Sequence, residues 1–445
     1  MNIHVKGVVA LAVSLLALQF MRPAITDKPA TAEIQVPQDV REVLDRSCYS
    51  CHSDQRRLSW FDQIVPAYWI VRYDVLRARA RLDFSTLGAQ PVATQRAALF
   101  EAINMVRLGT MPLPQFTAVH PDAKVSSEDL KTLETYLAPW SSAPQAAEVS
   151  IHAGAAAKVS FTSVEPEFNG LPIDPDFENW KPISTTDRGD NNSLRLILAN
   201  DIAFKATQTG NISPWPNGSR LAKIAWQQEL GPDGLIHPGK FIQVELMVKA
   251  ASDYKTTAGW GWGRWRGLDL KPYGRDSAFV KECTGCHMPV RGDDDVYTLP
   301  ITTAQPPGVE LVNHRAAALP SDLPLQPLGW NAITMYVDPR DHETAMLVGN
   351  DVAIKAVHLM TGGSKSPVYP DGAVLALVTW AQRDDPHWFG GRIPDMPLSV
   401  EFVEIGSAST YKCLAGTGLT AQGTTRQEAE RRMSFIVSLA PAQLP

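Results

Sequence analysis

Two copies of the pattern Cys-x-x-Cys-His constrain this chain more than any other feature. They run from Cys48 to His52 and from Cys283 to His287. Two thiols at this spacing can each add to one vinyl group of a porphyrin, and the adjacent histidine can then bind the iron, so the pattern is typical of c-type haem attachment. We therefore predict two covalently bound haem c groups, with His52 and His287 as iron ligands. The attaching thiols would be those of Cys48, Cys51, Cys283 and Cys286.

Composition limits the other function classes. The chain of 445 residues has a net charge of −6 and no basic cluster, which argues against nucleic acid as a partner. A zinc half-site or a disulfide could use the same cysteines, but no second Cys/His pair lies at zinc spacing. The fifth cysteine, Cys413, lies outside both motifs, and we expect a buried free thiol, with a redox role as the alternative.

The N-terminus carries an export signal. An apolar run from Val8 to Met21 is short for a membrane span but suits the core of a signal peptide. Ala30-Thr31-Ala32 is a candidate cleavage site, although it lies far from the apolar run. We therefore expect residues 1–32 to be a signal peptide or an uncleaved N-terminal anchor. Either one predicts a periplasmic protein, which agrees with haem attachment outside the cytoplasmic membrane.

Residues 33–145 read as an all-α domain around the first motif. Apolar residues at helical spacing predict helices over 60–81 and 94–108, and a capping pattern at 126–129 predicts a last helix. Several short helices around such a motif resemble a small cytochrome c. The stretch from Cys48 to Trp69 and the segment Leu82-Asp83-Phe84-Ser85, with Met111-Pro112 and His120-Pro121-Asp122-Ala123, also resemble the bacterial haem-binding domain family. That resemblance implies a small redox module and leaves its partner open.

A haem in such a domain takes a sixth iron ligand from the side opposite the motif. Met111, on the loop after the third helix, is our first candidate. His120 and Met105 are the alternatives, and Met105 lies within a predicted helix. Ligation by His and Met would raise the reduction potential and suit electron transfer.

Beyond a linker at 141–157 the chain repeats itself. Residues 194–206 recur as 344–356, and both copies contain Asn-Asp, an apolar residue and Ala in the same order. We therefore predict that 158–300 and 315–445 are two copies of one domain. Extended apolar runs after Asn-Gly and Asp-Gly turns predict an antiparallel sheet with helices on one side in each copy. The predicted fold class is α+β, an all-α domain followed by two sheet-rich domains.

Four features of the first repeat occur in combination: Ser184-Thr185-Thr186-Asp187-Arg188, the stretch from Gly210 to Gly218, the stretch from Trp260 to Gly267, and the second haem motif. With them the repeat resembles cytochrome P-460, a family of mono-haem periplasmic proteins that oxidise hydroxylamine, and its relatives, the beta-type cytochromes c-prime. It covers 158–300. A degenerate form without a haem motif covers 315–445, and we expect that copy to be structural.

The resemblance implies a five-coordinate iron with an open distal face and a lysine bonded to the porphyrin. Lys223 stands where that lysine is expected, and Glu245 and Arg195 resemble the family's distal carboxylate and arginine. The corresponding residues of the second copy are Leu377, Glu401 and Ala345. Without the resemblance, an isolated lysine on a strand would be read as a surface residue.

These features together predict a periplasmic di-haem oxidoreductase. It would bind hydroxylamine or nitric oxide at the open haem, oxidise hydroxylamine to nitric or nitrous oxide, and pass electrons through the His/Met haem to a soluble periplasmic cytochrome. The first alternative is a cytochrome that only binds or scavenges nitric oxide, which absence of a Lys223 bond would favour. A di-haem peroxidase would have two all-helical domains, and a pure electron carrier would need a sixth ligand on the second haem.

Overall fold

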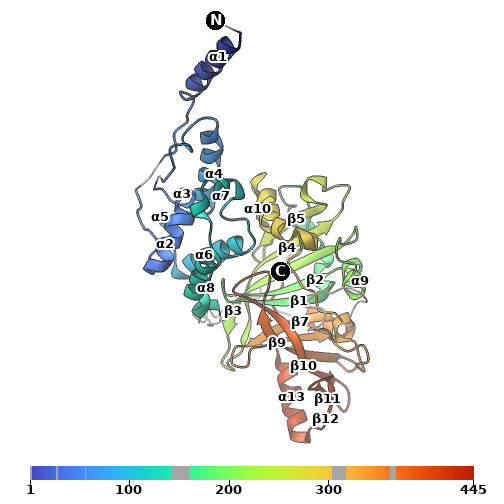
Figure 1. Cartoon of the computed structure of the whole chain (residues 1–445). Coiled ribbons are helices and arrows are strands. Elements are labelled where there is room, and N and C mark those ends of the chain that lie inside the picture. Colours follow the sequence, from blue (N-terminus) through green and yellow to red (C-terminus); the bar gives the residue numbers. More distant parts are fainter. Residues whose placement is uncertain (1–2, 27–28, 56, 142–159, 303–316, 361–366) are drawn as a thin grey trace. The chain divides into compact units, whose positions relative to one another are not determined.

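The computed structural model divides into two compact units, Met1–Pro139 and Trp140–Pro445 (Figure 1). It describes residues 3–26, 29–55, 57–141, 160–302, 317–360 and 367–445. Of the predicted linker at 141–157, residues 142–157 lie outside the described residues. The N-terminal unit is helical and the C-terminal unit contains one large antiparallel sheet, so the predicted α+β class is confirmed.

The N-terminal unit consists of short helices joined by tight turns. They are α1 (Ile3–Leu18), α2 (Gln38–Ser47), α3 (Tyr49–His52), α4 (Ala67–Arg81), α5 (Phe84–Leu87), α6 (Val92–Arg107), α7 (Pro114–Val119), the 3-10 helix η1 (Pro121–Ala123) and α8 (Ser127–Ser141). The helix predicted over 60–81 begins only at α4, so the first part of that prediction was wrong. Pro66 is the N-cap of α4, and a proline disfavours the helical conformation of the residue before it.

The predicted cap of the last helix is confirmed. The Asp129 amide donates to the Ser126 hydroxyl over 3.1 Å, and the Ser126 amide donates to the Asp129 carboxylate over 2.9 Å. This reciprocal pair satisfies two backbone donors that the first turn of α8 would otherwise leave unpaired.

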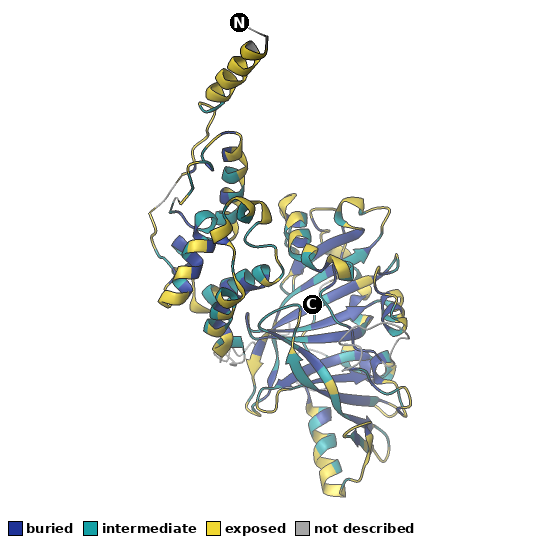
Figure 2. Ribbon diagram, in the orientation of Figure 1, coloured by how far each residue is buried: buried dark blue, intermediate teal, exposed yellow. Residues whose placement is uncertain are grey.

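Residues 19–26 and 29–34 are part of the N-terminal unit's packing. Ile25 is 3% exposed and packs with Val65, Tyr68 and Val75. Tyr68 donates to the Pro23 carbonyl over 2.6 Å. Helix α1 precedes this segment and exposes most of its apolar side chains (Figure 2). Among the helices of the described residues, none is both long and apolar enough to cross a membrane.

The C-terminal unit contains the two repeats as two halves with the same order of elements. The first half is η2 (Phe161–Ser163), η3 (Pro175–Asn179), β1 (Lys181–Arg188), β2 (Ser193–Ala199), α9 (Asp201–Thr209), β3 (Arg220–Leu230), β4 (Ile236–Lys249), η4 (Lys255–Thr257), β5 (Trp260–Arg266), β6 (Lys271–Pro272), α10 (Ala278–His287) and η5 (Met288–Asp293). The second half is η6 (Pro327–Gly329), β7 (Asn331–Asp338), β8 (Glu343–Gly349), α12 (Asp351–His358), β9 (Val374–Asp384), β10 (Gly391–Glu404), β11 (Thr410–Ala415), β12 (Thr420–Gln422) and α13 (Arg426–Ser438).

The two halves join into a single sheet through two short pairings. Each half has its six strands in sequence order, and β4 pairs with β7 only at Ile236 and Val337. At the other side β1 pairs with β10 through Asp187 with Arg392 and Arg188 with Gly391. The ring of strands is therefore closed at both seams by a few residues, and the halves face each other across a core.

The alternation of side chains along the strands builds three layers of core. One face of both half-sheets fills a shared cluster that includes Ala222, Ile224, Ala376 and Val378. The opposite face of the first half packs under α9 and α10, and that of the second half under α12 and α13. The strands are accordingly buried on both faces over most of their length (Figure 2). A functional group on the sheet must therefore lie on an outer face.

Candidate functional site

The first motif opens into a large apolar cavity in the N-terminal unit. Its volume is about 140 Å³, and its lining includes Cys48, His52, Met105 and Met111. An apolar lining with a few polar groups is typical of cofactor sites. The cavity brings the attaching thiol, the histidine and two sulfur ligand candidates around one space, which fits a haem.

His52 is held in one orientation by the backbone. Its Nδ1 lies 3.0 Å from the Leu82 carbonyl oxygen, which leaves Nε2 available to a metal. Burial lowers the pKa of His52 below its ordinary value, and this favours the neutral, metal-binding form. The ring also contacts Phe84 edge-on, with the centroids 6.3 Å apart.

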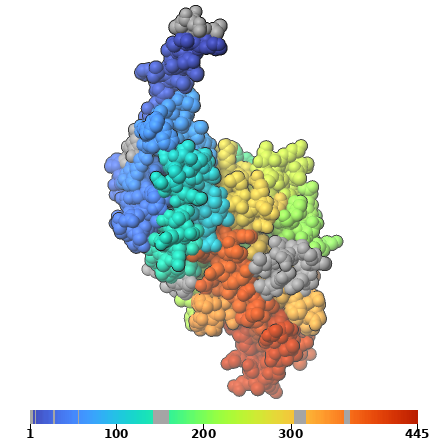
Figure 3. Space-filling model, viewed as in Figure 1, coloured from blue at the N-terminus to red at the C-terminus, as the bar shows by residue number. Residues whose placement is uncertain are grey.

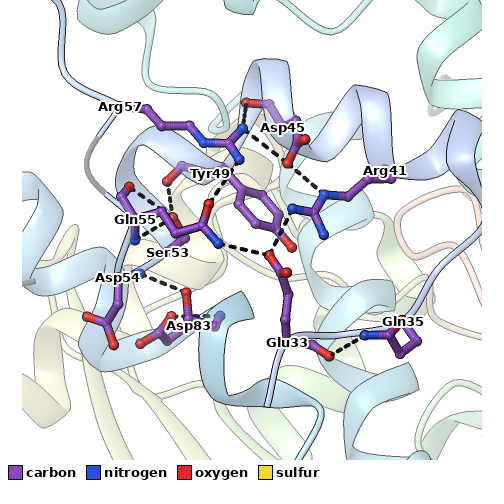
Figure 4. Close-up of polar contacts among 11 residues, drawn as sticks. Glu33, Gln35, Arg41, Asp45, Tyr49, Ser53, Asp54, Gln55, Arg57 and Asp83 are labelled. Carbon is purple, nitrogen blue, oxygen red and sulfur yellow. Dashed lines mark hydrogen bonds and ion pairs between the residues drawn. The ribbon is translucent and has the colours of Figure 1, made fainter. Parts of the chain in front are cut away.

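A polar cluster holds the first motif from its other side (Figure 4). Tyr49, the residue after the first cysteine, is fully buried, and its ring stacks on Phe84 with centroids 5.2 Å apart. The guanidinium groups of Arg41 and Arg57 lie 4.6 and 5.1 Å from the centre of the Tyr49 ring. Asp45 pairs with both arginines, at 2.7 and 3.1 Å. These contacts hold the backbone that carries the thiols.

The structure separates the three candidates for the sixth ligand. Met105 and Met111 both line the cavity. His120 does not, because its Nε2 lies 3.0 Å from the Asp62 carboxylate and its ring stacks between Phe61 and Phe116. This arrangement favours a methionine over His120 and keeps Met105 as the competitor of Met111.

The second motif forms the end of α10 in the first half of the C-terminal unit. The segment from α10 to η5 lies at the surface of this unit (Figure 3, yellow). Cys283 is buried, and burial raises the pKa of its thiol to about 12. The His287 Nδ1 lies 2.7 Å from the Asp295 carbonyl oxygen, and burial lowers the pKa of this histidine to about 4. His287 is thus oriented as His52 is, with Nε2 left for a metal.

The loop that orients His287 is itself anchored to the sheet. Asp294 and Asp295 both have positive φ angles, 54° and 64°. The buried Lys249 contacts the Asp294 carboxylate at 2.6 Å, and the Trp260 indole donates to the Asp294 carbonyl over 2.8 Å. These contacts stabilise a backbone conformation that is unfavourable for residues other than glycine.

Lys223, Glu245 and Arg264 lie side by side on three adjacent strands. The register of the sheet pairs Lys223 with Glu245 across β3 and β4, and Glu245 with Arg264 across β4 and β5. Lys223 forms an ion pair with Glu245, and Arg264 Nε lies 3.1 Å from the same carboxylate. All three point to the outer face, where their charges act on His287. The structure therefore brings together two of the three residues predicted here and adds Arg264.

The electrostatics of this cluster keep its carboxylate ionised. Burial acts to raise the pKa of Glu245, but the charges of Lys223 and Arg264 outweigh it and lower the pKa to about 2. Burial lowers the pKa of Lys223 below its ordinary value, although Glu245 opposes the change. Burial and the nearby Arg188 lower the pKa of Arg195 to about 10. Arg195 is near enough for its charge to act on both Glu245 and Lys223.

Arg264 is the functional candidate that the sequence interpretation missed. It lies in the alternating run Trp-Gly-Trp-Gly-Arg of β5, which places Trp262 and Arg264 on the same face. The Trp262 ring lies 4.6 Å from the His287 ring, between centroids. Period-two alternation with glycine between aromatic residues was the signal that could have found it.

A buried polar atom beside His287 fits a bound haem. The Nε1 of Trp262 is buried and has no hydrogen-bond partner among the described residues. Such a donor is satisfied in most proteins, by protein or by a bound group. With Cys283, Cys286 and His287 on one helix and an unsatisfied donor on a ring that contacts the histidine, the residues present suit a haem attached here.

In the second half, side chains of α13 lie at the position that corresponds to the charge cluster. Glu401 is 4% exposed and accepts from the Arg432 Nε of α13 over 2.8 Å. Leu377 pairs in register with Glu401, as Lys223 does with Glu245, and Cys413 pairs with it as Arg264 does. The carboxylate is thus retained while the lysine is lost. Cys413 is a partly exposed free thiol rather than a fully buried one.

Two family matches cover these two sites. Residues 9–139 match the family described as haem-binding domain, and residues 174–298 match the family described as cytochrome P460. Both resemblances drawn from the sequence are thereby confirmed. Comparison with individual curated proteins gave no match. The chain is a haem cytochrome with a haem-binding domain and a cytochrome P460 domain.

The cavity predicts the effect of removing the sulfur ligand. Met111→Ala should convert the first haem from low-spin to high-spin and lower its reduction potential, because an axial methionine raises it. His120→Ala is the matched control and should change neither property, because Asp62 holds that ring outside the cavity. Absorption spectra and redox titration measure both. An unchanged Met111→Ala spectrum, with loss of the low-spin form in Met105→Ala, would give the role to Met105.

The charge cluster predicts a pH dependence. The pKa of Glu245 is about 2 in the folded protein and 4.5 in an unfolded chain, so its contribution to stability is complete above pH 4.5 and disappears as the pH falls to about 2. Glu245→Gln should therefore lower the free energy of unfolding by about 3–5 kcal/mol at pH 7, because it removes the ion-pair partner of the buried Lys223 and one of the two carboxylates that pair with Arg264. Asp269→Asn, at an exposed ion pair, is the control and should change it little. A difference that did not shrink below pH 4.5 would contradict this electrostatic origin.

Proposed function

We propose that this cytochrome, with its haem-binding domain and its cytochrome P460 domain, is a periplasmic di-haem oxidoreductase that oxidises hydroxylamine. The observation that carries the proposal is the row of Lys223, Glu245 and Arg264 on the outer face next to His287. Cytochrome P460 proteins are haem enzymes that act on hydroxylamine. Lys223 of this row is the proposed counterpart of the lysine that the family bonds to its porphyrin.

The residues of the row have distinct proposed tasks. The haem iron, when bound, supplies a Lewis-acidic redox centre for a small nitrogen ligand. Hydroxylamine loses three protons and three electrons on the way to nitric oxide, so the site needs a proton acceptor. Glu245 is the proposed acceptor. Arg264 lies 3.1 Å from its carboxylate and 3.1 Å from Glu282, so it positions Glu245 and carries a fixed positive charge.

A bond from Lys223 to the porphyrin would change the basicity of Glu245. As an ammonium group, Lys223 is one of the two neighbouring cations that hold the carboxylate pKa at about 2, where it is a poor base. Bonding of the lysine nitrogen to the macrocycle removes that ammonium charge. Arg264 would then be the cation in direct contact, and the pKa of Glu245 would rise towards the range of a useful base.

The electron path is assigned to the N-terminal unit. A cavity with a histidine on one side and two methionine sulfurs in its lining suits a high-potential haem that transfers electrons. We propose a soluble periplasmic cytochrome as the acceptor. A di-haem peroxidase is disfavoured because the C-terminal unit is built on a sheet and not on cytochrome c-like helices. The remaining alternative is a cytochrome that binds nitric oxide without catalysis, and the Lys223 experiment below distinguishes it from the proposed enzyme.

The N-terminal segment is proposed to stay on the mature protein as an anchor. Cleavage after Ala32 would remove Ile25 from the core and Pro23 from its bond to Tyr68. The match to the haem-binding domain family begins at residue 9, inside the apolar helix. The packing of Pro23 and Ile25 therefore supports retention over removal.

Intact mass spectrometry tests the first part of this proposal. The protein isolated from the periplasmic side should retain residues 1–32 and exceed the apo-chain mass by two haems, because both motifs are complete and Ile25 is in the core. A double variant, Cys48→Ala with Cys51→Ala, should lose one haem only. A wild-type mass only one haem above the apo chain would contradict the di-haem assignment. A mature chain that starts at residue 33 would contradict the proposed anchor.

Lys223 separates the enzyme from the gas binder. Peptide mapping of the holoprotein should find the Lys223 segment joined through one porphyrin to the peptide with Cys283 and Cys286. Lys223→Leu imitates the second half at Leu377 and should keep the haem and nitric-oxide binding but lose hydroxylamine oxidation. Lys240→Leu changes an exposed lysine of the same sheet and serves as control. Full recovery of an unmodified Lys223 peptide would favour the nitric-oxide-binding cytochrome.

A further inference from the structure

The haem-lacking second half sends one loop across to the haem motif of the first half. The loop consists of residues 385–390, between β9 and β10, at the seam where β1 pairs with β10. The His387 Nδ1 lies 2.8 Å from the Tyr297 carbonyl oxygen. Tyr297 follows η5, and its hydroxyl donates to the Cys286 carbonyl over 2.7 Å. The second half therefore contacts the segment that surrounds the second motif.

This contact reaches the axial histidine in two ways. Tyr297 packs edge-on against the His287 ring, with centroids 5.1 Å apart. Tyr297 is also two residues from Asp295, whose carbonyl oxygen is the partner of His287 Nδ1. A hydrogen bond at the Tyr297 carbonyl thus restrains the short backbone segment that fixes the orientation of His287.

Trp388 fixes the loop to the first half. Its ring lies 5.9 Å from the Tyr297 ring, and the Arg188 guanidinium lies 4.4 Å from the Trp388 ring centre. The Trp388 indole donates to the Asp190 carboxylate over 3.2 Å, and Asp190 in turn pairs with Arg188. The loop is therefore attached to both β1 and the motif segment, with cation–π and hydrogen-bond contacts.

The corresponding loop of the first half supports a role linked to the haem. That loop, residues 231–235, packs onto the second half, where Leu235 lies in its outer core. Both loops have proline at their second position, but the first then has Asp233 and Gly234 where the second has His387 and Trp388. Each half thus packs one loop against the other half. His387 and Trp388 occur only in the loop that contacts a haem motif.

We propose that the second half acts as a positioning domain for the C-terminal haem, with His387 as the residue that sets the orientation of His287 through Tyr297 and Asp295. The inference rests on haem attachment at Cys283 and Cys286, as in the function proposed above. Partners of a metal-ligating histidine fix its ring and tune the metal. This role explains what a copy without a haem motif contributes to the cytochrome.

Three variants of the full holoprotein test this role. His387→Ala should shift the iron–histidine vibration of the C-terminal haem in resonance Raman spectra and lower hydroxylamine turnover about tenfold, the low end for outer partners of a metal-bound histidine. His387→Asn, which returns an N–H donor near the position of Nδ1, should restore both. Asp233→Ala, in the mirror loop, should change neither.

The readouts separate this inference from the function on which it rests. A haem-bearing peptide with Cys283 and Cys286 must first be found in each variant, and its absence from the wild type would remove the proposed function itself. If the haem is present and His387→Ala leaves the vibration unchanged, the positioning role is wrong. An equal shift in Asp233→Ala, or no recovery in His387→Asn, would show a general loosening of the sheet and would also overturn it.

Discussion

The alternation of side chains along paired strands decides where the C-terminal unit can carry chemistry. Ala222 and Ile224 are fully buried in the core shared by the two half-sheets, so Lys223 between them must point outward. The same register places Glu245 and Arg264 beside it on the next two strands. A shift of one residue would place three charges in the shared core, which desolvation forbids. The charged row and its position next to α10 therefore depend on the packing of the two halves against each other.

The second half shows how the same frame accommodates the loss of a haem motif. Leu377 lies between the buried residues Ala376 and Val378, so it also points outward, but into an apolar cluster with α13. Glu401 remains on this face, and a buried carboxylate without a partner would be strongly destabilising. Arg432 of α13 supplies the missing charge. Helix α13 thus compensates a carboxylate that both halves have at the same register position.

The sequence predicted the parts of the fold that have local signals. The repeated Asn-Asp runs cap α9 and α12 through the Asn200 and Asn350 side chains, and Gly218 and Gly372 have positive φ angles in the turns before β3 and β9. The joining of both repeats into one sheet had no local signal, because Ile236 and Val337 are far apart in the sequence. The partnership of Lys223 with Glu245 and the contact from His387 likewise depend on register and on the seam. Only the structure supplies these.

The two haem motifs hold their histidines in the same way but have different surroundings. In both, a backbone carbonyl holds the histidine Nδ1, from Leu82 for His52 and from Asp295 for His287, and burial disfavours the protonated ring. The first histidine faces an apolar cavity with methionine sulfurs in its lining, which suits the proposed electron-transfer haem. The second lies beside a row of alternating charges whose carboxylate suits the proposed role of proton acceptor. The proposed division of labour between electron transfer and substrate chemistry therefore rests on the surroundings of two similarly held histidines.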